Sequence, residues 1–224
     1  SVELVKEIAR AEEKEIPVVT VLSDSTQSTR ECYVGINSYH LGQTFGKQVL
    51  QNVTSDMLTV CVLMNRNEAN TNQNIIYSGI GEVLAKNAES PYKIYATAIQ
   101  DTGTFGAEET VRDIFLAEEK LPDVLICLDK LSTTSACQAV VDYNKVGEVE
   151  IIGCYSSDAI LQAIQKNVLQ ATVAFDTKGM GEECINAMTE YWKDGHVSEY
   201  KPVSVSLITA ENIGEYIENE TDIQ

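Results

Sequence analysis

Hydrophobic and polar positions alternate between two periods along the chain. Short runs that are apolar at almost every position predict buried strands, and apolar residues three or four positions apart predict amphipathic helices. Strands are predicted at Val18–Leu22, Tyr33–Ile36, Leu58–Met64, Tyr92–Ala98, Val124–Leu128, Ile151–Cys154, Ala171–Phe175 and Val203–Ile208. Helices are predicted around Val2–Lys14, Leu41–Leu50, Ile75–Leu84, Glu108–Leu116, Ser132–Tyr143, Ala159–Ile164, Met180–Trp192 and Asn212–Ile217.

This alternation predicts an α/β fold whose parallel sheets are covered by helices on both faces, because strands buried on both sides are apolar throughout. Open α/β sheets bind their ligands beyond the carboxyl ends of the strands. The candidate ligand-binding residues are therefore those at or just after the predicted strand ends. They are Ser23, Asp24, Asn65, Asp129, Tyr155, Phe175 and Asp176.

Two of these aspartates also have a structural interpretation. Asp129 has no second carboxylate or histidine placed by the sequence to assist it, and Asp176 opens a helical pattern. For both, a hydrogen-bonding or capping role is favoured over chemistry, because aspartate at a helix start accepts bonds from free amide groups. In the helix after Asp176, the residues Met180, Cys184, Met188 and Trp192 recur every four positions. This stripe is predicted to be core, packed on the sheet of a first lobe.

Charge excludes several classes of partner. The 224 residues include 16 Lys plus Arg and 34 Asp plus Glu, which gives a formal net charge of −18. Such a surface repels phosphate backbones and anionic lipid, so nucleic-acid binding is not expected. No apolar run approaches the roughly 20 residues that a membrane span needs. Ser1 opens directly into a charged helical pattern, so no signal peptide is seen.

The sequence offers little catalytic or metal-binding chemistry. Its six cysteines form no CxxC pair, and there are two histidines, so the thiols are interpreted as free, buried and structural. Gly79-Ile80-Gly81 lacks the third glycine of a dinucleotide loop and lies inside a helical pattern. No phosphate loop, GxSxG elbow or HExxH pair is present. No catalytic residue, metal or cofactor is predicted; an α/β enzyme of unrecognised type is the alternative class.

Several short segments, taken in order, resemble the type I periplasmic sugar-binding proteins. They are Ile16–Thr20 (IPVVT), Tyr33–Gly35 (YVG), Asn37–Gly42, Leu121–Val124 (LPDV), Ile151–Gly153 (IIG), Gln170–Ala174 (QATVA) and Leu207–Ile213 (LITAENI). The resemblance covers nearly the whole chain, and it is carried by the order and spacing of the segments together.

The resemblance implies two Rossmann-like lobes joined by a hinge, with a ligand held between them. The chain would cross between the lobes near Asn37, Phe175 and Val205. Residues 1–36 and 176–204 would form the first lobe, and residues 37–175 and 205–224 the second. The first lobe is expected to be incomplete at its N-terminal side, since family members have a strand, a helix and a strand before the helix that starts here.

Five positions depart from the family pattern in the same direction. Where sugar-binding members have charged or amide side chains, this chain has Leu22, Ile76, Leu128, Tyr155 and Phe175. A buried hydroxyl without a partner costs about 1–3 kcal/mol, so these changes predict a site more apolar and aromatic than a monosaccharide pocket.

The resemblance implies an extracytoplasmic solute-binding protein, bacterial in origin, of an ABC-type transporter. It would bind a small molecule, sugar-like or more apolar, and would have a membrane permease or a receptor kinase as its partner. Two alternatives share the fold. One is the extracellular sensor domain of a signalling receptor, and the other is the effector domain of a LacI-type transcription regulator.

Overall fold

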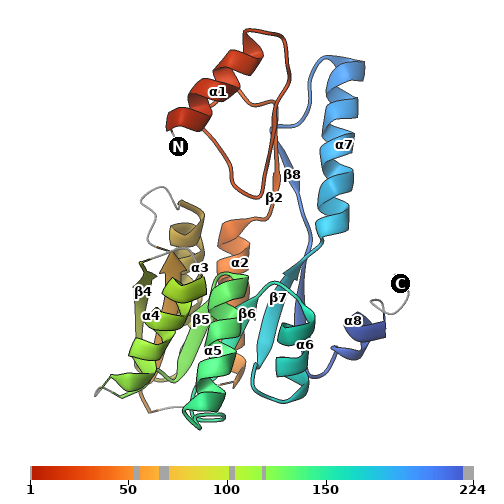
Figure 1. Cartoon of the computed structure of the whole chain (residues 1–224). Helices are drawn as coiled ribbons and strands as arrows, with labels where there is room; N and C mark the ends of the chain where they lie inside the picture. The colour runs from red at the N-terminus through yellow and green to blue at the C-terminus, as the bar shows by residue number, and fades with distance from the viewer. Residues whose placement is uncertain (1, 53–55, 66–70, 101–103, 118–119, 219–224) are drawn as a thin grey trace. The chain divides into compact units, whose positions relative to one another are not determined.

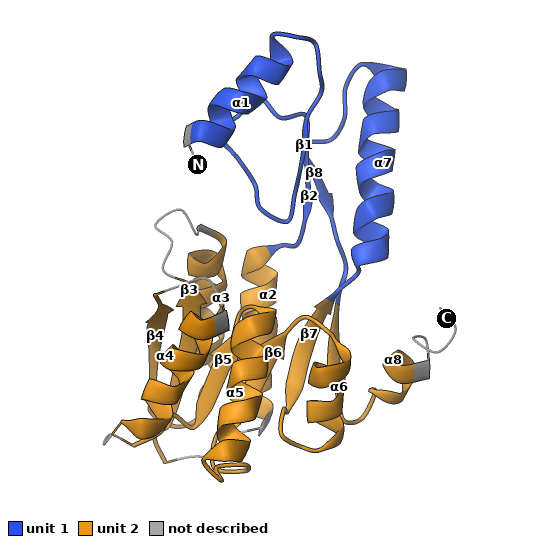
Figure 2. Cartoon of the chain, in the orientation of Figure 1, with its two compact units in different colours: residues 1–37, 175–205 blue, residues 38–174, 206–224 orange. Residues whose placement is uncertain are grey.

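The chain folds into two compact units, each built from segments distant in the sequence. The computed structural model describes residues 2–52, 56–65, 71–100, 104–117 and 120–218. Unit 1 comprises residues 1–37 and 175–205, and unit 2 comprises residues 38–174 and 206–224 (Figure 2). Both are α/β, as the hydrophobic pattern predicts.

Unit 2 is built on a six-stranded sheet with the order β4-β3-β5-β6-β7-β9. Its strands are β3 (Leu58–Asn65), β4 (Tyr92–Ile99), β5 (Val124–Cys127), β6 (Glu150–Cys154), β7 (Ala171–Phe175) and β9 (Val205–Thr209). The pairs from β4 to β7 are parallel, with Val62 facing Ala96 on one side and Ile126 on the other. Parallel strands place their carboxyl ends along one edge of the sheet, which is where candidate site residues gather.

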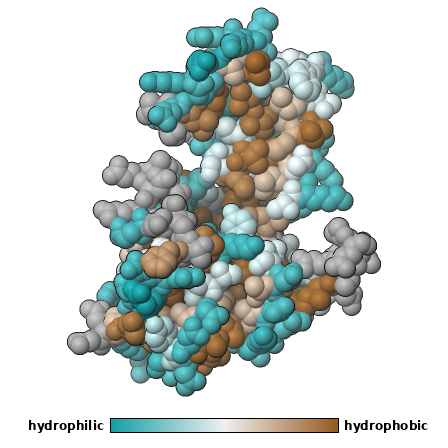
Figure 3. All heavy atoms as spheres, viewed as in Figure 1, coloured by the Kyte–Doolittle hydropathy of each residue, from teal (hydrophilic) through white to brown (hydrophobic). Residues whose placement is uncertain are grey.

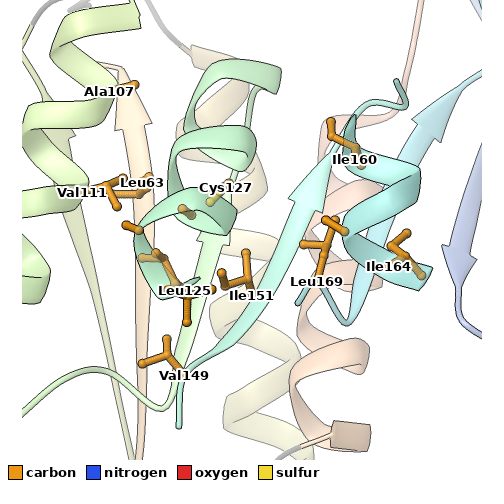
Figure 4. Packing of buried hydrophobic residues seen from close by; sticks show 14 of the residues in the cluster. Leu63, Ala107, Val111, Leu125, Cys127, Val149, Ile151, Ile160, Ile164 and Leu169 are labelled. Atoms are coloured by element: carbon orange, nitrogen blue, oxygen red, sulfur yellow. The ribbon is translucent and has the colours of Figure 1, made fainter. Parts of the chain in front are cut away.

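Helices cover both faces of this sheet. They are α2 (Ser38–Asn52), α3 (Thr71–Asn87), α4 (Thr104–Leu116), α5 (Lys130–Asp142), α6 (Asp158–Gln165) and the short α8 (Gly214–Glu218). In Figure 1, α4, α5 and α6 lie on the near face, with α2 and α3 behind it. Under the near helices Leu63, Leu125 and Ile151 pack against helix residues such as Val111 and Ile164 (Figure 4). All five side chains are fully buried, so this layer is the hydrophobic core of unit 2.

Unit 1 has a three-stranded parallel sheet with the order β1-β2-β8, accompanied by two helices. The strands are β1 (Val19–Val21), β2 (Cys32–Gly35) and β8 (Tyr200–Pro202), and the helices are α1 (Val2–Glu12) and α7 (Thr177–Asp194). Side chains alternate across β2: Cys32 and Val34 pack with Met180 and Ala187 of α7, whereas Tyr33 stacks on Tyr200 of β8. Figure 3 shows hydrophobic side chains of unit 1 reaching the surface between α1 and α7.

The prediction that the Met180 stripe of α7 is core is right at one end and wrong at the other. Met180 is 6% exposed and Cys184 packs against the same cluster, but Trp192 is 71% exposed. A helix turns about 100° per residue, so a spacing of four drifts by about 40° at each step. Over twelve residues the drift is about 120°, which carries Trp192 off the buried face. Ala187, seven residues after Met180, stays on that face and is fully buried.

Strand β8 was not predicted from the sequence. It has three residues, ends in Pro202, and precedes the strand that was expected at Val203–Ile208 and lies at Val205–Thr209. Proline is compatible with this place because β8 is an edge strand of the described sheet.

Candidate functional site

Three neighbouring strands of unit 2 end in polar or aromatic residues at the same edge of the sheet. Asn65 is the last residue of β3, Asp129 follows β5 by two positions, and Tyr155 directly follows β6. Because β3, β5 and β6 are adjacent and parallel, these residues share the carboxyl edge. The side chains of Asn65 and Asp129 meet: Nδ2 of the amide donates to Oδ2 of the carboxylate at 3.4 Å.

Asp129 is also the N-cap of α5, as the sequence predicted. Its Oδ1 accepts a hydrogen bond from the Ser132 N–H at 2.8 Å, so one carboxylate oxygen serves the helix and the other faces Asn65. The buried hydroxyl of Thr133 donates to the Asp129 carbonyl at 2.7 Å and accepts from the Cys154 N–H at 3.1 Å. This hydroxyl ties the start of α5 to the end of β6, and so fixes Asp129 relative to Tyr155.

Asn65 is held by a residue that the sequence reading missed. The Asn65 N–H donates to Oε1 of Gln73 at 2.9 Å, and Gln73 is a buried polar residue of α3, 8% exposed. The available signal was an amide side chain in the first turn of the helix that follows the strand. Gln73 therefore holds the Asn65 backbone in place at the carboxyl edge through α3.

Tyr155 has a strained backbone. Its φ of 72° lies in the left-handed region, which is unfavourable for a bulky residue. The surrounding bonds hold it there: the Tyr155 N–H donates to the Val173 carbonyl at 2.7 Å, and the Thr172 hydroxyl donates to the Tyr155 carbonyl at 2.6 Å. Burial raises the pKa of the phenol, and the nearby Cys154 and Asp129 groups add to the effect. Strain of this kind is often found at functional sites.

In unit 1, Asp24 is engaged in an internal ion pair. Nε and Nη2 of Arg30 donate to its two oxygens at 2.6 and 2.8 Å, and the Thr20 hydroxyl and Ser25 N–H add bonds at 3.0 and 2.7 Å. Burial alone would raise the pKa of the Asp24 carboxyl, but these bonds, that of Arg30 foremost, outweigh it and lower the pKa. Arg30 also donates to the Glu199 carbonyl at 3.0 Å. The sequence did not identify Arg30, and the geometry gives Asp24 a structural partner.

Leu22 and Ser23 form a tight turn at the end of β1. Leu22 has φ 62°, and the Ser23 N–H donates across it to the Val21 carbonyl at 2.7 Å. The Tyr33 hydroxyl donates to the Leu22 carbonyl at 2.9 Å, while its ring stacks on Tyr200 with centroids 5.6 Å apart. Burial, with a contribution from Tyr200, raises the pKa of Tyr33 to about 12. Ser23 is exposed at this turn.

The other two candidates lie where β7 leads into α7. Phe175, the last residue of β7, is partly buried, and Asp176 is exposed. Oδ1 of Asp176 accepts from the Gly179 N–H at 2.8 Å, which confirms the predicted N-cap. The Asp176 N–H donates to the Ser204 carbonyl at 3.1 Å.

Two of the five positions that depart from the family pattern belong to the interior of unit 2. Ile76 and Leu128 are 6% and 8% exposed. Their side chains add neither a charge nor a hydrogen-bonding group to the carboxyl edge. The edge therefore offers Asn65, Asp129 and the Tyr155 ring among the residues predicted for ligand binding.

The thiols of the described residues are free, and four of them are buried. Burial raises the pKa values of Cys137 and Cys154 to about 12, so these thiols are protonated and unreactive at neutral pH. Among the described residues, no cluster of three or more His, Cys, Asp or Glu side chains is arranged to hold a metal ion. Within the same ranges, no helix combines the length and the apolar character needed to cross a membrane.

Sequence comparison assigns the chain to a family. The family model described as "Periplasmic binding protein domain" matches residues 2–196, so the chain belongs to this family. This confirms the resemblance read from the sequence segments. Curated protein sequences gave no match.

Several solved structures share the fold of this chain. The protein in the "XylFII-LytSN complex" is 28% identical, with a TM-score of 0.79 over 93% of this chain and 72% of that one. GanP, a glucose-galactose binding protein from Geobacillus stearothermophilus, is 22% identical, with a TM-score of 0.83 over 94% of this chain and 74% of its own. A solute-binding protein from Agrobacterium vitis with bound D-fucose is 19% identical, with a TM-score of 0.83 over 96% and 74% of the two chains.

Proposed function

We propose that the chain is an extracytoplasmic solute-binding protein that binds a small molecule and does not catalyse a reaction. The ligand would contact the carboxyl edge of the unit 2 sheet through Asn65, Asp129 and Tyr155. The observation that carries this proposal is the 3.4 Å contact between Asn65 and Asp129, with strained Tyr155 on the next strand. Family membership supports a binding role, because the matched structures are binding proteins.

The chemistry of this edge suits a ligand with an apolar body and few hydroxyls. The Asp129 carboxylate and the Asn65 amide can each hydrogen-bond a hydroxyl, and the Tyr155 ring can pack against an apolar or aromatic surface. Ile76 and Leu128 are buried and supply no further hydrogen-bonding group. Ligand sites typically combine an apolar lining with a few placed polar groups. We therefore expect an aryl glycoside to bind more tightly than the sugar alone.

Calorimetry on the purified chain tests this proposal with a matched pair of ligands. Phenyl β-D-galactoside and methyl β-D-galactoside differ in the aromatic group, and D-fucose and glucose extend the series to simple sugars. We expect the phenyl compound to bind at least tenfold more tightly than the methyl compound. Tighter binding of the simple sugars would contradict the apolar character of the site, and no binding by any of the four would contradict the site itself.

Variants separate the roles of the edge residues. Asp129→Asn keeps a good N-cap residue but removes the charge, so the fold should be retained while affinity falls about tenfold or more. Asp142→Asn, at the opposite end of the same helix, is the matched control and should bind as the wild type does. Equal affinities for the two variants would exclude Asp129 from the site.

A second candidate function is that of a subunit in a membrane sensor. The specific observation is that the structure at 28% identity is a protein in complex with LytSN. In that case the partner would be a receptor's extracellular domain, whereas a transporter subunit would bind a permease. Co-purification of the chain with each class of partner, with and without the bound glycoside, distinguishes the two.

A further inference from the structure

A surface groove in unit 2 lies between α4 and α5, and its lining includes none of Asn65, Asp129 and Tyr155. Figure 1 shows these two helices side by side on the near face of the sheet, and they are in contact with each other. The groove has a volume of about 590 Å³, and Phe105, Glu108, Glu109, Arg112, Asp142 and Tyr143 are among its lining residues. We call it the α4–α5 groove. Along α4 it extends roughly 10 Å, from a rise of about 1.5 Å per residue.

An exposed aromatic side chain lies at one end of the groove. Phe105, in the first turn of α4, is 74% exposed, the highest value among the large hydrophobic residues described. At the other end Tyr143 stacks on Phe115, with ring centroids 5.6 Å apart, and so forms a fixed wall. Exposed aromatic residues beside a shaped groove are typical anchors of protein interfaces.

The charged residues that line the groove are mainly acidic. Its one basic lining residue, Arg112, already pairs with Glu109 at 3.4 Å and with Asp113 at 3.0 Å. No basic side chain in the described part of the chain forms an ion pair with Glu108 or Asp142. The carboxylate of Asp142 lies in the last turn of α5, which contains no basic residue. A carboxylate is unfavourable at the negative end of a helix, so a cation arriving there would be stabilised.

We propose that the α4–α5 groove is a docking surface for a basic protein segment that carries an apolar side chain. The apolar side chain would pack on Phe105, and Lys or Arg residues on either side would face Glu108 and Asp142. Charge complementarity selects this occupant. A second copy of this chain, with its charge of −18, would be repelled, as would nucleic acid or an anionic membrane.

The probe is a fluorescein-labelled amphipathic helical peptide of Lys and Leu, titrated with the whole chain and followed by fluorescence anisotropy at about 150 mM salt. We expect micromolar binding that falls at least tenfold in Phe105→Ser and in the double variant Glu108→Gln with Asp142→Asn. Leu116→Ser is the matched control, because Leu116 lies at the other end of α4 and is 60% exposed. Glu182→Gln with Glu211→Gln changes the net charge equally at exposed positions elsewhere. Both controls should bind as the wild type does.

Two results would overturn the proposal. One is the absence of peptide binding up to a concentration of about 1 mM. The other is an equal loss of affinity in the groove variants and their controls, which would mean that the peptide responds to net charge alone. Circular dichroism of each variant checks that the fold is retained. Glycoside calorimetry on the same samples reports the proposed ligand site separately, so the two proposals can fail independently.

Discussion

Breaking the ion pair between Arg30 and Asp24 by removing one partner should strongly destabilise unit 1. Arg30 donates three hydrogen bonds, two of them to the carboxylate, and the two side chains are 12% and 15% exposed. Replacing Arg30 with Met keeps most of the side-chain volume but removes the charge and all three donors. Asp24 would then be a largely buried carboxylate without its counter-ion.

The expected loss of unfolding free energy is about 2–4 kcal/mol. Removing one partner of a buried ion pair typically costs about 3–5 kcal/mol, because the remaining charge is uncompensated. Here the expected loss is somewhat smaller, since the Thr20 hydroxyl and the Ser25 N–H still donate to Asp24. Arg10→Met is the matched control: Arg10 also binds a carboxylate, that of Glu7, but both side chains are 63% exposed. That exposed pair should contribute less than about 1 kcal/mol.

Urea unfolding at pH 7 measures both variants. Far-ultraviolet circular dichroism follows the unfolding, because helices of both units contribute to the signal. The effect should also depend on pH with a definite sign. The pKa of Asp24 is lowered in the folded state, so its contribution is present above the unfolded value and is lost as the pH falls through the folded one. The difference between wild type and Arg30→Met should therefore shrink below about pH 4.

Equal destabilisation by Arg30→Met and Arg10→Met would refute this reasoning. So would a difference that stays constant between pH 7 and pH 3, because the carboxylate would then have no part in it. Asp24→Asn in the Arg30→Met background removes the uncompensated charge and should recover part of the lost stability.

Three further predictions concern packing and burial. Gly79→Ala places a methyl group 2.6 Å from a backbone oxygen of α2, so it should lower the melting temperature. In Gly81→Ala, on the same helix, the new methyl group meets nothing within 4 Å. That variant should be more stable by about 0.5–1 kcal/mol in urea unfolding. Met180→Ala should lower the unfolding free energy by about 2–5 kcal/mol, and Trp192→Ser by less than about 0.5, in melts followed by circular dichroism; equal effects would contradict the burial pattern of α7. The pKa of Cys154 is raised to about 12, so it stays protonated when folded but ionises when unfolded, and above pH 9 this thiol alone should lower stability by about 1.4 kcal/mol per pH unit, in addition to the similar effect of Cys137. Urea unfolding at pH 8 and pH 10 tests this, and Cys154→Ala should reduce the dependence.

The fold class could be predicted from the sequence because each strand is a short apolar run between helical patterns. Strand β8 could not, since three residues ending in proline carry almost no periodic signal. In α7 the spacing of four correctly indicated Met180 but not Trp192, because the real period is shorter than four.

For the candidate site, a position just after a predicted strand correctly indicated residues of the carboxyl edge. The side chains that bind those residues could not be predicted in this way. Asn65 and Asp129 were identified as separate strand-end residues, and their contact follows from the adjacency of β3 and β5. Gln73 and Arg30 were missed because each acts through a partner that only the folded chain brings near. No sequence pattern indicated the left-handed backbone of Tyr155, where glycine or asparagine would be the ordinary choice.

The division of the chain into two interleaved units has a consequence for its synthesis. Unit 2 is almost contiguous, whereas the sheet of unit 1 needs β8, which is made only after residues 38–174 have left the ribosome. At about 5–20 residues per second, that stretch takes roughly 7–27 s. During this interval β2 is present without its neighbour β8, and Cys32 and Val34 are without the helix that covers them. Unit 2 should therefore fold first, and unit 1 is the part of the nascent chain most exposed to chaperones and proteases.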